Sequence, residues 1–182
     1  MGYLQTLKRG VGYFYSHKVL RILAFDSVTI AVLAFLDIWL FQPKLEQLHV
    51  NIAYFGVVIG VMAGLQAIIL NNFGRLEKIS GSKKRFLLLS AVIPGVGYIA
   101  LGMNDSALFS MILIVLIGGF GIPRYILFSN YMNKYIPSSN RATVLSTVSM
   151  FRSLGMAISY PIVGLLAEHS LNSTLIIIGV LI

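Results

Sequence analysis

Long runs of apolar residues alternate with short polar and basic stretches along this chain. Six apolar segments can be marked, at 22–41, 51–72, 86–103, 107–128, 142–167 and 171–182. A helix of about 20 apolar residues crosses the hydrocarbon core of a bilayer. The pattern therefore predicts an all-α polytopic membrane protein with five complete transmembrane helices and part of a sixth. The last segment holds twelve residues, so we expect it to cross only if the natural chain continues.

The composition agrees with a membrane protein and excludes several other classes. Hydrophobic residues make up 57% of the chain and charged residues 11%, whereas a soluble domain carries about 25% charged residues. The net charge of +8 comes from residues between the apolar segments, so we expect no nucleic-acid partner. The chain has no cysteine, and its three histidines lie far apart. No metal, nucleophile or nucleotide motif is present, and we expect neither an enzyme nor a cofactor.

The basic residues predict an orientation. If the helices alternate from a cytoplasmic N-terminus, eleven of the fourteen lysines and arginines fall on the cytoplasmic side, and the outer loops hold only Lys44. Lysine and arginine are enriched on that side of a membrane. The chain is thus predicted to lie in the plasma (inner) membrane with its N-terminus in the cytoplasm. Residues 1–21, which are basic and partly amphipathic, are expected to lie along the inner membrane face.

Two stretches carry a resemblance to a known family. The first, GRLEKISGSKKR at 74–85, has a glycine, a leucine two positions later, a second glycine and a basic cluster. The second, NKYIPSSNRATVLSTVSMFRSLGMAISYPIVGLLAE at 133–168, joins a polar loop to a helix rich in small residues. In these stretches the chain resembles the C-terminal six-helix half of the major facilitator superfamily of secondary transporters, and its drug-efflux members in particular. Lys78 departs from the first motif, because the family most often has an acidic residue there.

The resemblance implies half of a twelve-helix fold, with 22–182 as the transmembrane half-domain and 1–21 as the end of a central cytoplasmic linker. A missing N-terminal six-helix half would be the partner. The implied mechanism is alternating access around a midplane site, with ion-coupled efflux of a small organic molecule in antiport with a proton. The first motif would be a cytoplasmic gating loop, or alternatively a simple basic anchor. Its residues are Gly74, Arg75, Leu76, Glu77, Lys78, Gly81, Lys83, Lys84 and Arg85.

Ionisable and polar residues inside the apolar segments are the candidate coupling sites, because a charge at the bilayer centre costs about 2.5–3.5 kcal/mol. Asp26 and Asp37 fall within roughly 20° of one helix face and are candidates for proton or substrate coupling. Arg152 is a candidate for an ion pair, with Asp26 as its partner, or for substrate contact. Gln66 is expected to bond a neighbouring helix or a ligand. Arg124 is interpreted as reaching out to the membrane surface.

Small residues and prolines in the segments predict how the helices pack and bend. Three glycines of the second segment repeat every four residues, which favours close approach of another helix. A proline in the fourth segment follows several glycines and predicts a bend. An alternative is that the chain is a free-standing small membrane protein, a scaffold or assembly factor, that dimerises through this glycine face. The packing and bending residues are Gly56, Gly60, Gly64, Pro123, Gly155, Pro161 and Gly164.

Overall fold

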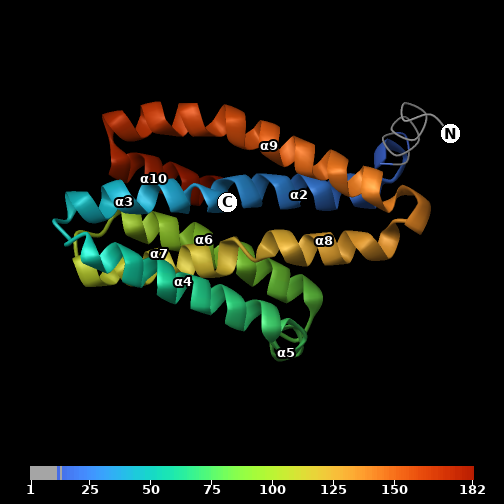
Figure 1. The fold of residues 1–182 in the computed structure, drawn as a ribbon, viewed down its shortest axis with the longest axis horizontal. Helices are drawn as coiled ribbons and strands as arrows, with labels where there is room; N and C mark the ends of the chain where they lie inside the picture. The colour runs from blue at the N-terminus through green and yellow to red at the C-terminus, as the bar shows by residue number, and fades with distance from the viewer. Residues whose placement is uncertain (1–11, 13) are drawn as a thin grey trace.

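The computed structural model describes residues 12 and 14–182, and its regular elements are all α-helices (Figure 1). Most of the predicted linker at 1–21 lies outside the described residues. The all-α prediction is confirmed for the described part of the chain. Its helices are α2 (Lys18–Phe35), α3 (Asp37–Gln47), α4 (Ala53–Asn71), α5 (Phe73–Ile79), α6 (Lys83–Gly102), α7 (Ala107–Gly121), α8 (Arg124–Tyr135), α9 (Ser138–His169) and α10 (Leu171–Leu181).

Five helical stretches are long and apolar enough to cross a membrane, as the hydrophobic pattern predicts. They are Leu20–Gln47, Ala53–Asn71, Lys83–Gly102, Ala107–Lys134 and Ser138–His169. The sixth segment forms the shorter apolar helix α10. The sequence predicts a loop at 74–85, but the first half of this stretch belongs to α5, a helix of seven residues.

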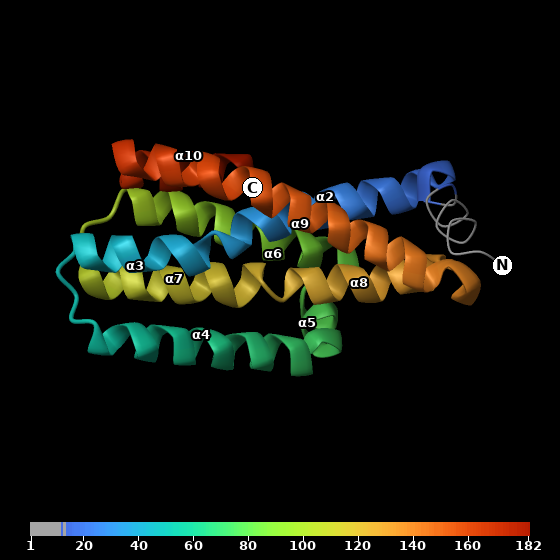
Figure 2. The same cartoon turned by 45° about the horizontal axis from the view of Figure 1, so that its top comes forward.

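The long helices lie side by side along the length of the molecule (Figures 1 and 2). Helix α7 is central and contacts α2, α3, α4 and α6, whereas α9 packs on α2 and α10. In Figure 2, α4 lies on the outer side of α7. In the most apolar stretch of α9, only 6% of the residues are buried. In the corresponding stretch of the span formed by α7 and α8, 56% are buried. Helix α9 therefore keeps a wide apolar face without a partner among the described residues.

The fourth span is interrupted between α7 and α8 (Figure 2). Pro123 lies at this point, and proline cannot donate the backbone hydrogen bond that would continue the helix. The glycines of α7 that precede it lower the cost of bending further. The interruption falls where the proline and glycines predict a bend.

The first span is interrupted at Leu36, between α2 and α3, and no proline lies there. Tyr98 of α6 provides the physical cause. Its hydroxyl donates a 3.0 Å hydrogen bond to the carbonyl oxygen of Leu33, while the Leu36 N–H makes only a 3.3 Å bond to that oxygen. A side chain that occupies a helix carbonyl in this way bends the helix.

The two interruptions are neighbours in space. Helix α3 packs on α7 on one side of them, and α2 packs on α8 on the other. The structure thus has one pair of adjacent helices on each side of a common break. We call the end that holds the start of α2, α5 and the start of α9 the basic end, because Arg21, Arg75, Lys83 and Arg141 lie there.

The close helix contacts do not lie where the sequence places them. A Cβ atom added at Gly56, Gly60 or Gly64 would meet nothing within 4 Å, so in the described residues this glycine face has no packing partner. Gly164 is equally open, and α9 continues through Pro161 without a break. Gly155 does pack, since its added Cβ would lie 3.1 Å from the Val32 side chain.

Helices α6 and α10 instead make the closest approach. A Cβ added at Gly179 of α10 would lie 2.6 Å from the Gly95 carbonyl oxygen and 2.8 Å from the Ile99 nitrogen. Both atoms belong to the backbone of α6, which cannot move aside as a flexible side chain can. A glycine repeat on one helix identifies a face that another helix could approach closely. Which helix packs there, if any, depends on how all the helices are arranged.

These two glycine environments give a matched prediction. Gly179→Ala should destabilise the protein by about 1–3 kcal/mol, because the added methyl group overpacks the α6–α10 contact. In this chain measured without any partner on α4, Gly60→Ala should leave stability unchanged or raise it, since alanine favours helix. Thermal unfolding in detergent measures both. Equal loss of stability in the two variants would contradict the packing described for α6 and α10.

Candidate functional site

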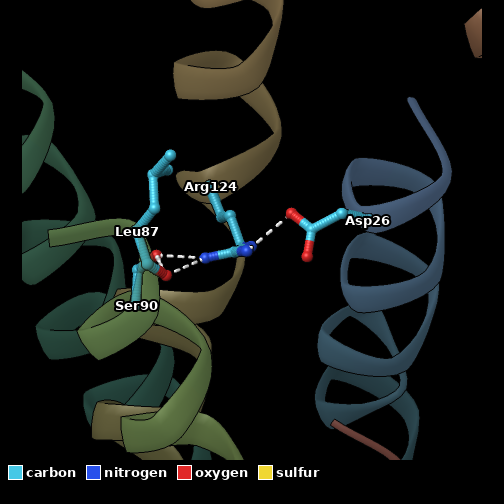
Figure 3. A network of polar contacts seen from close by, with 4 residues as sticks. All are labelled: Asp26, Leu87, Ser90 and Arg124. Atoms are coloured by element: carbon cyan, nitrogen blue, oxygen red, sulfur yellow. Dashed lines mark hydrogen bonds and ion pairs between the residues drawn. The ribbon is translucent and has the colours of Figure 1, made fainter. Parts of the chain in front are cut away.

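A partly buried network around Arg124 links three helices (Figure 3). The Arg124 Nη2 atom lies 2.8 Å from Oδ2 of Asp26, and the two side chains are 4% and 38% exposed respectively. Nη1 of Arg124 donates to the Leu87 carbonyl oxygen and to the Ser90 hydroxyl. The arginine of α8 thus joins α2 to α6, with its charge balanced by one carboxylate.

The local sequence explains how Arg124 reaches this position. Pro123 ends the preceding helix, so Arg124 is the first residue of α8. Its guanidinium also lies over the ring of Phe128, with 4.7 Å between the guanidinium carbon and the ring centre. Such cation–π contact adds to the stability of an arginine removed from water.

This network corrects two expectations. Arg124 does not extend toward the membrane surface but is buried in the network. Arg152 does not pair with Asp26; its guanidinium carbon lies 3.7 Å from the ring centre of Tyr125. Arg152 thereby connects α9 to α8. The sequence gives the depth of each arginine in the membrane, but it does not tell which one faces Asp26.

Asp37 is the second acidic candidate and has a different environment. It is the first residue of α3 and is 1% exposed, and neither carboxylate oxygen has a hydrogen-bond partner. Oδ2 lies against α7, since a Cβ added at Gly118 would be 2.8 Å from it. An isolated charge in such a place is very costly. The side chain therefore needs a proton or a cation to be stable there.

Asp26 and Asp37 do not form one site. About eleven residues of helix separate them, which is roughly 16 Å along the axis, and the interruption at Leu36 lies between them. Asp26 belongs to the network with Arg124, whereas Asp37 lies at the joint of the two interrupted spans. Asp26 and Asp37 would share one face of an ideal helix, but they do not lie together in the structure.

Gln66 bonds a neighbouring helix. Its Nε2 donates a 3.3 Å hydrogen bond to the Gly118 carbonyl oxygen, which connects α4 to α7. Gly118 therefore touches α4 through this bond and Asp37 of α3 on another side. The glycine allows the two helices to approach α7 at the same level.

Lys44 is a polar residue whose position the sequence does not reveal. The hydrophobic pattern predicts an outer loop at this residue, but Lys44 lies in α3 with 0% of its surface exposed. Its Nζ donates a 2.9 Å hydrogen bond to Oδ1 of Asn172 at the start of α10. The only feature of the sequence that marks Lys44 is that it is the single basic residue in the predicted outer loops.

The stretch at 74–85 lies at the basic end. Gly81 adopts a φ of +79°, a conformation that favours glycine, and the Ser82 hydroxyl accepts a hydrogen bond from Arg85 N–H to cap α6. Lys83 lies over the Tyr131 ring of α8 at 5.7 Å. One buried carboxylate oxygen of Glu77 has no hydrogen-bond partner. The Lys83–Tyr131 contact attaches the basic stretch to α8.

A groove follows the contact between α2 and α9. It consists of two hollows, of about 400 and 280 Å³, which share Val28 and Thr29. The first hollow is lined by Phe14, Arg21, Ala24, Phe25, Val28, Thr29 and Phe151. The second, farther from the basic end, is lined by Val28, Thr29, Val32, Leu33, Gly155, Ser159 and Leu181. The combined groove has the size of a small-molecule site.

The family model described as the Major Facilitator Superfamily matches residues 22–182. No curated protein and no solved structure matches the chain. Within the described residues, no group of three or more histidine, aspartate or glutamate side chains could hold a metal ion.

Proposed function

The chain belongs to the Major Facilitator Superfamily of membrane transporters, and from this premise we propose that it forms part of a proton-coupled exporter of small organic molecules. The observation that carries this proposal is Asp37, a buried carboxylate without a hydrogen-bond partner at the joint of two interrupted helices. Such a group can take up and release a proton when the joint changes shape. The α2–α9 groove supplies a path for the organic molecule.

A proton suits Asp37 better than a metal cation. Hard cations take six or more oxygen ligands, and the side chain of Met62 lies against the same glycine that Asp37 touches. The Tyr98 hydroxyl, which is also buried, donates to Leu33. The surroundings therefore offer few free oxygen atoms beside the carboxylate, and a bound proton removes its charge without further ligands.

Alternating access requires a second body against which these helices move. The wide apolar face of α9 and the glycine face of α4 have no partner among the described residues. We place a second set of six helices against these faces. This arrangement explains the open glycines better than the scaffold alternative does, because it covers both faces with one partner.

The proposed orientation puts the basic end in the cytoplasm. Single cysteines test it directly, since the chain has none of its own. Cysteine at exposed Lys84 should react with a membrane-impermeant maleimide only after the membrane is opened. Cysteine at exposed Asp105, at the opposite end, should react in intact cells. The reverse pattern would overturn the orientation.

Transport itself is tested with the complete natural protein in liposomes that contain a pH-sensitive dye. A panel of amphipathic anions, cations and neutral molecules is added, and proton movement is recorded against protein-free liposomes. At least one class should drive protein-dependent proton flux. If a folded, reconstituted protein gives no flux with any member of the panel, the proton-coupled function is wrong.

A further inference from the structure

We propose that the α2–α9 groove selects amphipathic organic anions, with the apolar body along the groove and the negative group at Arg21. The inference rests on the proposed transport function and adds the chemical class of the substrate. It follows from the residues that line the groove, from the placement of the acidic side chains and from the dimensions of the groove.

The lining residues are almost entirely apolar. Aliphatic side chains of α2 line both hollows. Aromatic side chains, which include Phe151 of α9, complete the first hollow, and Leu181 at the end of α10 lines the second. Thr29 and Ser159 add two hydroxyl groups. Among the residues that the structure describes, Arg21 is the only ionisable one in the lining of either hollow. A ligand that fills this space must be mainly apolar, and its one strong electrostatic partner is a cation at the basic end.

No acidic residue in the described part of the chain opposes that cation within the groove. Asp26, on the same helix, does not line either hollow, and its charge is balanced by Arg124. Asp37 lies on α3 against α7 and lines neither hollow. A positively charged ligand would therefore find repulsion at Arg21 and no carboxylate along the walls, whereas a negative group would find a partner.

The geometry fits an elongated molecule. The lining runs along α2 from Arg21 to Leu33, a rise of roughly 18 Å. An arginine guanidinium binds carboxylate and sulfonate groups through paired hydrogen bonds. A ligand with one negative group at Arg21 and an apolar chain along the groove would contact both the guanidinium and the apolar lining.

The experiment compares two permanently charged probes that share the same alkyl chain, dodecanesulfonate and dodecyltrimethylammonium. Uptake is measured with the complete natural protein in phosphatidylcholine liposomes. The wild type should take up the sulfonate faster than the ammonium compound. Arg21→Gln should reduce sulfonate uptake about tenfold, the usual value of a hydrogen bond to a charged group, and Arg21→Lys should retain most of it. Lys18→Gln, an exposed charge outside the lining, is the matched control and should change little.

Three results would overturn the inference. Faster uptake of the ammonium probe would show that the groove does not select anions, and the proposed transport function would still stand. An equal effect of Lys18→Gln would show that surface charge, not the groove, sets the preference. Anionic phospholipid retained by the wild type but lost in Arg21→Gln, detected by native mass spectrometry, would assign the groove to a membrane lipid. Absence of proton flux with every compound would instead overturn the transport function itself.

Discussion

Asparagine in place of Asp37 is expected to abolish transport driven by a pH gradient while the protein remains folded. The amide has the shape of the acid but cannot exchange a proton. Because the carboxylate oxygens have no hydrogen-bond partners in the structure, the substitution breaks no bond. It also removes a buried group that is costly when charged. Gradient-driven uptake in proteoliposomes should fall to the protein-free level, whereas exchange of substrate without a gradient should continue.

The matched control is Glu46→Gln, which removes an exposed carboxylate from the same helix and should leave coupling intact. Thermal unfolding of Asp37→Asn in detergent should occur at or above the wild-type temperature. Gradient-driven uptake that persists in Asp37→Asn would assign proton coupling to another residue, and Asp26 would be the next to replace.

Leucine in place of Arg124 is expected to give the largest loss of stability. The substitution leaves Asp26, the Leu87 carbonyl and the Ser90 hydroxyl without their shared donor. Removing one partner of a buried ion pair costs about 3–5 kcal/mol. We expect about 3 kcal/mol, at the lower end of that range, because water reaches the Asp26 side chain, which is 38% exposed. Thermal unfolding in detergent measures the change.

The double variant Asp26→Asn with Arg124→Leu should be more stable than Arg124→Leu alone, since no unpaired carboxylate remains. Arg75→Gln is the control, because Arg75 is an exposed arginine at the basic end. Loss of the same stability in Arg75→Gln, or no recovery in the double variant, would contradict a specific role for the Asp26–Arg124 pair.

The spans were predictable because a bilayer imposes length and apolarity on each helix separately. The apolar runs alone give five crossings. The bend in the fourth span falls at Pro123, which follows the glycines of α7 and cannot donate a backbone hydrogen bond, although α9 continues through Pro161 without a break. Each of these features depends on residues close together in the chain.

The partners of the charged residues were not predictable in the same way. Arg124 and Arg152 both lie inside apolar segments, and only the rotation of α8 and α9 places one against Asp26 and the other against Tyr125. The bend at Leu36 has no local signal, because its cause is the hydroxyl of Tyr98 on α6. Likewise, α10 approaches α6 closely through Gly179 and Gly95, although the glycine repeat is on α4.

The paired helix interruptions mean that neither of the two adjacent spans is one continuous rod. Helix α3 packs on α7 on one side of the break, and α2 packs on α8 on the other side. Because the run of helical hydrogen bonds is interrupted at Leu36 and at Pro123, one helix pair can tilt about the break while the other pair keeps its side-chain contacts.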